Sequence, residues 1–116
     1  MVLVNNNHWI VIFVLIEESK ILILDPFGKN DQLKDKIQFN GGKYLKEIFG
    51  KNFETIDIKK RSMQSDNYNC GVYCCFYLDK LVNHVANGGK ITNIDLYMDI
   101  TPSEYRKKIK KMLLSI

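Results

Sequence analysis

Two neighbouring apolar stretches near the start of the chain predict a β-hairpin. Residues 9–16 form a run of eight apolar residues rich in Ile and Val, which suits a strand buried on both faces. The polar stretch 17–20 predicts a turn, and the apolar stretch 21–24 predicts a second strand. We expect that strand to end at Asp25, because the proline that follows it cannot donate to the hydrogen-bond ladder.

The middle of the chain predicts two short helices and then a strand. Apolar positions recur at helical spacing in residues 32–39 and again in residues 43–49, where Gly50 follows as a stop. We expect the Asn-Gly-Gly stretch 40–42 to break the chain between these helices, because such residues favour turns. Apolar and polar side chains roughly alternate over residues 53–58, which predicts a third strand.

Two longer helices are predicted in the second half. Residues 70–85 should form one of them, and its stretch 72–78 is apolar all round, which is typical of a central buried helix. The sequence Thr-Pro-Ser-Glu at 101–104 has the pattern of a capping box with proline at the first helical position, which predicts a terminal helix over 103–115. The apolar face of that helix, expected to dock on the core, holds Tyr105, Ile109, Met112, Leu113 and Ile116.

These elements predict an α+β fold, with a small, mostly antiparallel sheet packed on the central helix. The 116 residues suffice for one core, so we expect a single domain over residues 1–116. No stretch of 18 apolar residues occurs, and the first residues lack the basic start of a secretory signal. We therefore expect a protein that is neither membrane-spanning nor secreted.

The cysteines indicate a free thiol. The chain has three of them, Cys70, Cys74 and Cys75, and an odd, clustered set does not form a disulfide framework. No second Cys/His pair stands at ligand spacing, so no metal site is predicted. A reducing, intracellular compartment and a reactive thiol fit this pattern better.

Cys70 is the candidate nucleophile. It lies where a polar loop meets the central helix, so a thiolate there would lie near the positive end of the helix dipole. The backbone N–H groups of Cys70 and Gly71 could point at a substrate carbonyl, and we expect Gly71 to let the chain turn sharply. Taken alone, a cysteine in an apolar run is more often an inert buried thiol.

Three other side chains supply what a cysteine nucleophile needs. His8 and Asp25 lie at the two ends of the predicted hairpin, on one sheet edge, so the carboxylate can fix the imidazole and leave its other nitrogen for the thiol. Gln64, six residues before Cys70, can donate its amide to the oxyanion. Asp66 could replace Asp25, but it would crowd the nucleophile. This constellation predicts acyl transfer by a thiol.

Trp9 and His84 lie outside this set of four residues and have simpler interpretations. Trp9 either packs beside the imidazole or belongs to the ordinary core, and the sequence favours neither alternative. His84, late in the predicted central helix, is best interpreted as a helix C-terminal residue.

The positive charge is confined to the terminal helix. Residues 101–116 carry a net charge of +4, whereas the first 100 residues hold 12 basic and 12 acidic side chains. One interpretation is a solvated outer face; the other is an anion-binding surface that contacts nucleic acid. The basic residues concerned are Arg106, Lys107, Lys108, Lys110 and Lys111.

At these residues the chain resembles the superfamily of the adenoviral maturation protease (adenain) and the ubiquitin-like-protein-specific proteases. Members have His-Trp, an acid 17 residues after the His, then Gln, then Cys-Gly. The matching residues here are His8-Trp9, Asp25, Gln64 and Cys70-Gly71. The resemblance implies a papain-like cysteine protease core whose central helix starts at the nucleophile. Only seven residues precede His8, so we expect the N-terminal part of that core to be short or missing.

The finer resemblance is to adenain. Residues 25–28 (DPFG), 31–34 and 38–39 resemble the adenain stretch after its catalytic acid, and residues 70–76 resemble its nucleophile helix, double cysteine included. Adenain commonly has Glu where this chain has Asp25, and the spacing from Gln64 to Cys70 is that of the SUMO protease branch. No cysteine lies between Asp25 and Gln64, so adenain's disulfide to its activating peptide does not carry over.

The resemblance implies a thiol endopeptidase that acts on viral or mobile-element structural precursors, in a host cell or virion. An alternative is a deconjugase for SUMO or another ubiquitin-like modifier, and a third is an inactive binding module whose basic helix contacts an acidic partner or nucleic acid. The chemistry requires no cofactor, although DNA or an activating peptide would be consistent with the resemblance. The resemblance implies a protein substrate, and the oligomeric state stays open.

Overall fold

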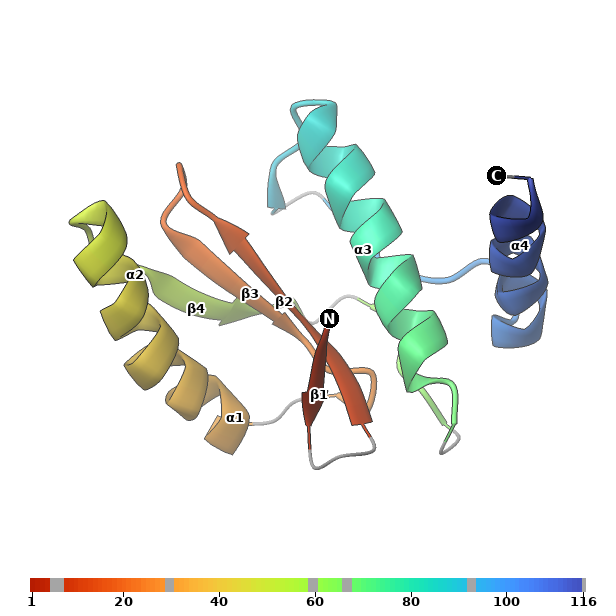
Figure 1. Cartoon of the computed structure of the whole chain (residues 1–116), viewed down its shortest axis with the longest axis horizontal. Helices are drawn as coiled ribbons and strands as arrows, with labels where there is room; N and C mark the ends of the chain where they lie inside the picture. The colour runs from red at the N-terminus through yellow and green to blue at the C-terminus, as the bar shows by residue number, and fades with distance from the viewer. Residues whose placement is uncertain (5–7, 29–30, 59–60, 66–67, 92–93, 116) are drawn as a thin grey trace.

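The computed structural model describes residues 1–4, 8–28, 31–58, 61–65, 68–91 and 94–115. Its sheet has four strands in the order β1-β2-β3-β4 (Figure 1). They are β1 (Val2–Val4), β2 (His8–Leu15), β3 (Lys20–Leu24) and β4 (Glu54–Asp57). The first three strands are antiparallel, and β4 pairs parallel with β3. The predicted mostly antiparallel sheet and α+β class are therefore confirmed.

The predicted hairpin is present as β2 and β3. Val11 pairs with Leu24 and Leu15 with Lys20, so the start of β2 and the end of β3 lie at the same end of the sheet. Ser19 in the turn has a φ of 57°, which completes the tight reversal. The sequence prediction assigned no strand to Val2–Val4, which pairs with the first three residues of β2.

The predicted break at residues 40–42 is wrong. The chain runs without interruption through α1 (Asp31–Lys36), the π-helical η1 (Ile37–Gly41) and α2 (Gly42–Phe49), and ends at Gly50. A side-chain carbon at Gly42 would come within 3.1 Å of the Gln38 amide, and one at Gly41 within 3.9 Å of Ile21. A side chain at Gly42 would crowd the Gln38 amide, whereas one at Gly41 would make only an ordinary contact. Both glycines have helical φ and ψ angles, so the helix continues through them despite their preference for turns.

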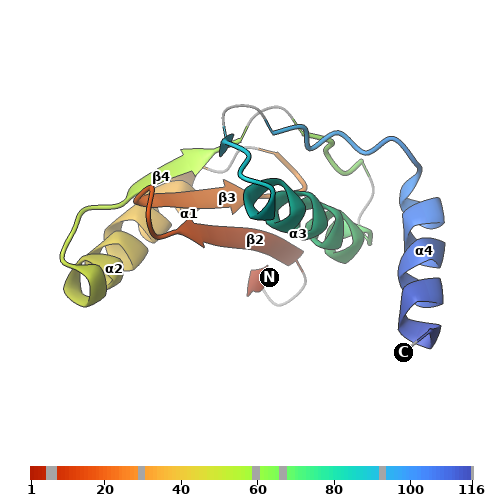
Figure 2. The same cartoon turned by 90° about the horizontal axis from the view of Figure 1, so that it is seen from above.

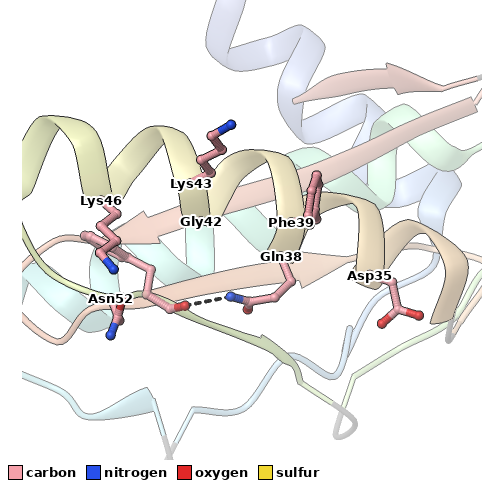
Figure 3. A pocket seen from close by; sticks show the side chains of 8 residues that line it. Asp35, Gln38, Phe39, Gly42, Lys43, Lys46 and Asn52 are labelled. Atoms are coloured by element: carbon pink, nitrogen blue, oxygen red, sulfur yellow. Dashed lines mark hydrogen bonds between the residues drawn. The ribbon is translucent and has the colours of Figure 1, made fainter.

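Gln38 joins this helix to β4 (Figure 3). Its Nε2 donates to the carbonyl of Phe53 at 2.8 Å, and its Oε1 accepts from the backbone N–H of Thr55 at 2.7 Å. The amide therefore bonds to β4 much as a neighbouring strand would. A hollow of about 640 Å³ lies beside it, and Lys43 and Lys46 are among the residues that line this hollow.

The sheet lies between the α1–α2 helix and the central helix α3 (Cys70–Ala86), as Figures 1 and 2 show. Alternate residues of β2 and β3 pack against α3, so that Val11, Leu15, Leu22 and Leu24 share one core with the helix. The α3 side chains buried in that core are Val72, Tyr73, Cys74, Phe76, Tyr77 and Leu81. The prediction of a central buried helix that starts at Cys70 is confirmed.

The last helix, α4 (Pro102–Leu114), lies at one end of the molecule (Figure 2). Thr101 and Glu104 form the predicted capping box, and Tyr105 is buried against the edge of Phe76. The predicted docking fails farther along, because Met112 and Leu113 are 56 % and 64 % exposed. The first turns contact the core and the later ones leave it; Ile116 lies outside the described residues. None of the helices described is long and apolar enough to cross a membrane.

Candidate active site

His8 and Asp25 meet at the open end of the β2–β3 hairpin. The Nε2 atom of His8 lies 2.6 Å from Oδ1 of Asp25, and both side chains are largely buried. The other ring nitrogen, Nδ1, is buried and has no hydrogen-bond partner among the described residues. The contact that the hairpin predicted is thus present, and the imidazole keeps one nitrogen for a further proton donor.

The turn after β3 fixes this carboxylate. Oδ1 of Asp25 also accepts from the backbone N–H of Phe27 at 2.9 Å, and the Asp25 carbonyl accepts from the N–H of Gly28 at 2.9 Å. The Phe27 ring stacks on the His8 imidazole, with centroids 4.3 Å apart. The tight turn therefore holds both the carboxylate and one face of the imidazole.

A buried arginine, Arg61, also contacts the turn after β3. Arg61 is only 4 % exposed, and its Nη2 donates to the Asp25 carbonyl at 3.0 Å. Its Nη1 donates to the Ile58 carbonyl and lies 3.1 Å from the carboxylate of Asp57. The guanidinium thus links the end of β4 to the backbone of Asp25. The sequence prediction assigned this arginine no role.

Gln64 lies directly beside the turn after β3, which contains Asp25 and Pro26. It is 7 % exposed, and its backbone N–H donates to the Pro26 carbonyl at 2.7 Å. The segment that carries Gln64 is also held to α3, because the Tyr77 hydroxyl donates to the Ser62 carbonyl. Gln64 is therefore placed by neighbours on two different elements.

Cys70 is the first residue of α3, as predicted, and its side chain is buried with about 7 % of its surface exposed. The first helical hydrogen bond runs from the N–H of Tyr73 to the carbonyl of Asn69, so the N–H groups before Tyr73 have no acceptor within the helix. No hydrogen bond joins His8 Nδ1 to the Cys70 thiol in the described structure. Such bonds commonly tighten only when substrate is bound.

The sharp turn expected at Gly71 is absent. Gly71 is an ordinary helical residue without a positive φ, and a side-chain carbon there would lie 3.9 Å from the Trp9 ring, an ordinary contact distance. Trp9 is 38 % exposed, so it is not a core residue. It lies instead against the first turn of α3, next to Cys70.

The three thiols have different surroundings. Cys74 is fully buried, and desolvation together with the neighbouring Cys70 and Cys75 raises its pKa to about 12. A thiol with such a pKa stays protonated at neutral pH and is a poor nucleophile. Cys75 is partly exposed, and all three cysteines are free thiols. Cys70 is the one at the helix N-terminus.

A cleft of about 460 Å³ opens beside Cys70. Its walls come from three elements: Trp9 of β2, the first turn of α3, and Arg106 and Ile109 of α4. The Nη2 atom of Arg106 donates to Oδ1 of Asn69 at 2.7 Å. The first turns of α4 therefore form part of the wall next to the thiol.

The structure separates the predicted basic residues. Arg106 faces Asn69, whereas Lys107, Lys110 and Lys111 line a shallow hollow on another side of α4. Lys108 lies over the Tyr105 ring, 5.9 Å from its centroid. The five residues thus do not form one surface.

The sequence offers one alternative acid, Asp66, and one further histidine, His84. Asp66 falls outside the described residues. His84 lies in the last turn of α3 and its Nε2 is 2.6 Å from the carbonyl of Lys90, which confirms its interpretation as a residue at the helix C-terminus.

Comparison with known proteins identifies the family. Residues 1–112 match the model of the Ulp1 protease family, C-terminal catalytic domain. A search of curated proteins found no match. The family match spans nearly all the elements described above, from β1 to α4. The chain therefore belongs to the Ulp1 protease family and is a cysteine peptidase that acts on protein substrates.

Proposed function

We propose that Cys70, His8 and Asp25 form the catalytic triad of this peptidase, with Gln64 as the oxyanion donor. The observation that carries this proposal is the state of the His8 imidazole. Nε2 is bound to Asp25 at 2.6 Å, and Nδ1 is buried without a partner among the described residues. A buried imidazole nitrogen that lacks a partner costs free energy, and a transferable proton from a neighbouring thiol would remove that cost.

The groups suit each step of peptide hydrolysis. His8 Nδ1 takes the proton of Cys70, and the sulfur attacks the scissile carbonyl to form a tetrahedral oxyanion. The Gln64 amide and the backbone N–H groups of Cys70 and Gly71 stabilise that oxyanion. When the C–N bond breaks, the imidazolium gives its proton to the leaving amine. Water, deprotonated by His8, then hydrolyses the thioester and regenerates the thiol.

Cys70→Ala tests the proposal. We expect this variant to lose turnover and keep its free energy of unfolding, because the change removes the nucleophile and little packing. Cys75→Ala, five residues farther along α3 and on the same cleft, is the matched control and should keep its activity. Peptides with Gly before the scissile bond serve as substrates, and iodoacetamide labelling locates the reactive thiol. Labelling of Cys75 with Cys70 spared would overturn the assignment.

For the substrate, we propose structural precursor proteins of a virus or mobile element. The support is the resemblance of residues 25–28 and 70–76 to adenain. Deconjugation of SUMO or another ubiquitin-like modifier is the second candidate, and the family match favours it. Parallel assays with a SUMO fusion and with short Gly-containing peptides separate the two. Cleavage of the fusion alone would reject the precursor proposal.

A further inference from the structure

Asn69 immediately precedes the nucleophile but does not cap the helix that the nucleophile begins. Asn is among the most favourable N-cap residues, because its side-chain oxygen accepts from N–H groups of the first turn. Here the Asn69 side chain makes no capping hydrogen bond, and its Oδ1 accepts from Arg106 at 2.7 Å instead. Its backbone, with φ −99° and ψ 12°, is also far from the extended conformation of a capping residue.

An N-cap side chain accepts from the N–H groups at the second or third helical position, which here are those of Gly71 and Val72. The N–H of Gly71 is also a donor for the proposed oxyanion, so a capped α3 would direct a neutral amide oxygen at it and compete with the substrate oxygen. We infer that Arg106 is a positioning residue that holds the Asn69 side chain away from the start of α3, so that the N–H groups next to Cys70 stay open. This inference rests on the proposed function of Cys70.

The position of α4 fits this role. Asn69 is 7 % exposed, so its side chain has little access to other partners in solvent. Arg106 follows Tyr105, which is buried against Phe76 of α3, and Tyr105 thereby fixes the first turn of α4 beside α3. Arg106 also lines the cleft next to Cys70. Its guanidinium is thus anchored at the place where a hydrogen bond to Asn69 can affect the nucleophile.

The test is a pair of single variants and their combination. In Arg106→Ala, the Asn69 side chain loses this hydrogen bond; we expect its backbone to relax toward the extended conformation of a cap and kcat to fall roughly five- to tenfold, with little change in KM. Asn69→Ala alone should keep kcat within about twofold, since alanine is a poor cap. In the double variant, the loss caused by Arg106→Ala should disappear. Lys107→Ala, one residue along α4, is the matched control and should behave as the wild type.

A second measurement does not depend on turnover. Amide hydrogen exchange at Gly71 or Val72 should slow in Arg106→Ala, because a cap at Asn69 accepts from the N–H at the second or third helical position. Arg106→Lys, which retains a donor, should restore both kcat and the exchange rates toward the wild type.

The outcomes separate the inference from the proposed triad. An equal loss of kcat on Arg106→Ala with and without Asn69 would overturn the inference, and so would unchanged exchange at the first turn. A Cys70→Ala variant that keeps its activity would overturn the triad. The exchange result would then decide the positioning role of Arg106.

Discussion

Two regions of the candidate site are built in different ways. The region that carries the imidazole comes from the β2–β3 hairpin and the 61–64 segment, and its polar side chains are buried: Asp25 at 6 %, Arg61 at 4 % and Gln64 at 7 % exposed. The other region is the α4 wall of the cleft beside Cys70, which contacts the body through Tyr105 and the Arg106–Asn69 hydrogen bond, and the later turns of α4 are exposed.

The proposed function assigns the two regions different roles. Proton transfer and oxyanion binding need distances fixed to a few tenths of an ångström, and buried hydrogen bonds supply that precision. In α4, only Arg106 is inferred to act on the first turn of α3, and the outer face of the helix has no proposed part in the reaction. We therefore expect substitutions on the hairpin side to change kcat strongly and those on the outer face of α4 to change it little.

Asp25→Asn should give the largest effect on the hairpin side. An amide can keep the hydrogen bond from Phe27 N–H but no longer holds the imidazole in the required tautomer, so kcat should fall by roughly three to four orders of magnitude. Single-turnover kinetics measure the loss, and thermal unfolding checks the fold. Asp35→Asn, on the exposed face of α1, is the matched control. A kcat within tenfold of the wild type would contradict the assignment.

Gln64→Ala should have the next largest effect. Removal of one oxyanion donor lowers kcat by roughly two to three orders of magnitude and leaves KM nearly unchanged. Gln64→Glu sharpens the test, because it keeps the shape of the side chain and replaces the donor with an acceptor. Gln32→Ala, exposed on α1, serves as control. An unchanged kcat in both Gln64 variants would reassign this residue to loop structure.

Arg61 contributes both to the stability of the fold and to the position of Asp25 in the candidate site. Arg61→Met removes the partner of the Asp57 carboxylate and the donor to the Asp25 carbonyl, so the free energy of unfolding should fall by about 3 kcal/mol. Urea denaturation measures this loss. The double variant Arg61→Met with Asp57→Leu should recover part of the stability, because no buried carboxylate is then left without its partner. Equal stability of wild type and Arg61→Met would show that the ion pair contributes nothing net.

The sequence predicted well those parts of the fold that depend on local pattern. The strands β2, β3 and β4 and the helices α3 and α4 lie within one or two residues of their predicted ranges, and the His8–Asp25 contact followed from the hairpin alone. Each of these features depends on periodicity or on residues that one turn brings together.

The features that the sequence did not predict depend on packing between distant segments. The hydrogen bonds from Arg61 to Asp25 and from Arg106 to Asn69 join residues 36 and 37 positions apart, and no local pattern marks them. The glycines at 41 and 42 favour a break until the sheet is in place beside them. The exposure of Met112 and Leu113 likewise depends on where the body of the protein ends, which helical periodicity cannot indicate.

The lysines of α4 should give the smallest effect on catalysis. With Lys107, Lys108, Lys110 and Lys111 changed to Gln, we expect kcat/KM within about twofold of the wild type, because the described contacts of these side chains lie away from Cys70. We propose that these lysines bind nucleic acid; the variant should then lose DNA binding that, in the wild type, weakens steeply between low and moderate salt. Fluorescence anisotropy with a DNA duplex measures both proteins. Equal DNA affinities of the wild type and the variant, or a DNA affinity that does not change with salt, would reject the nucleic-acid role. The lysines would then form a solvated face that takes no part in the reaction, unlike the hairpin side.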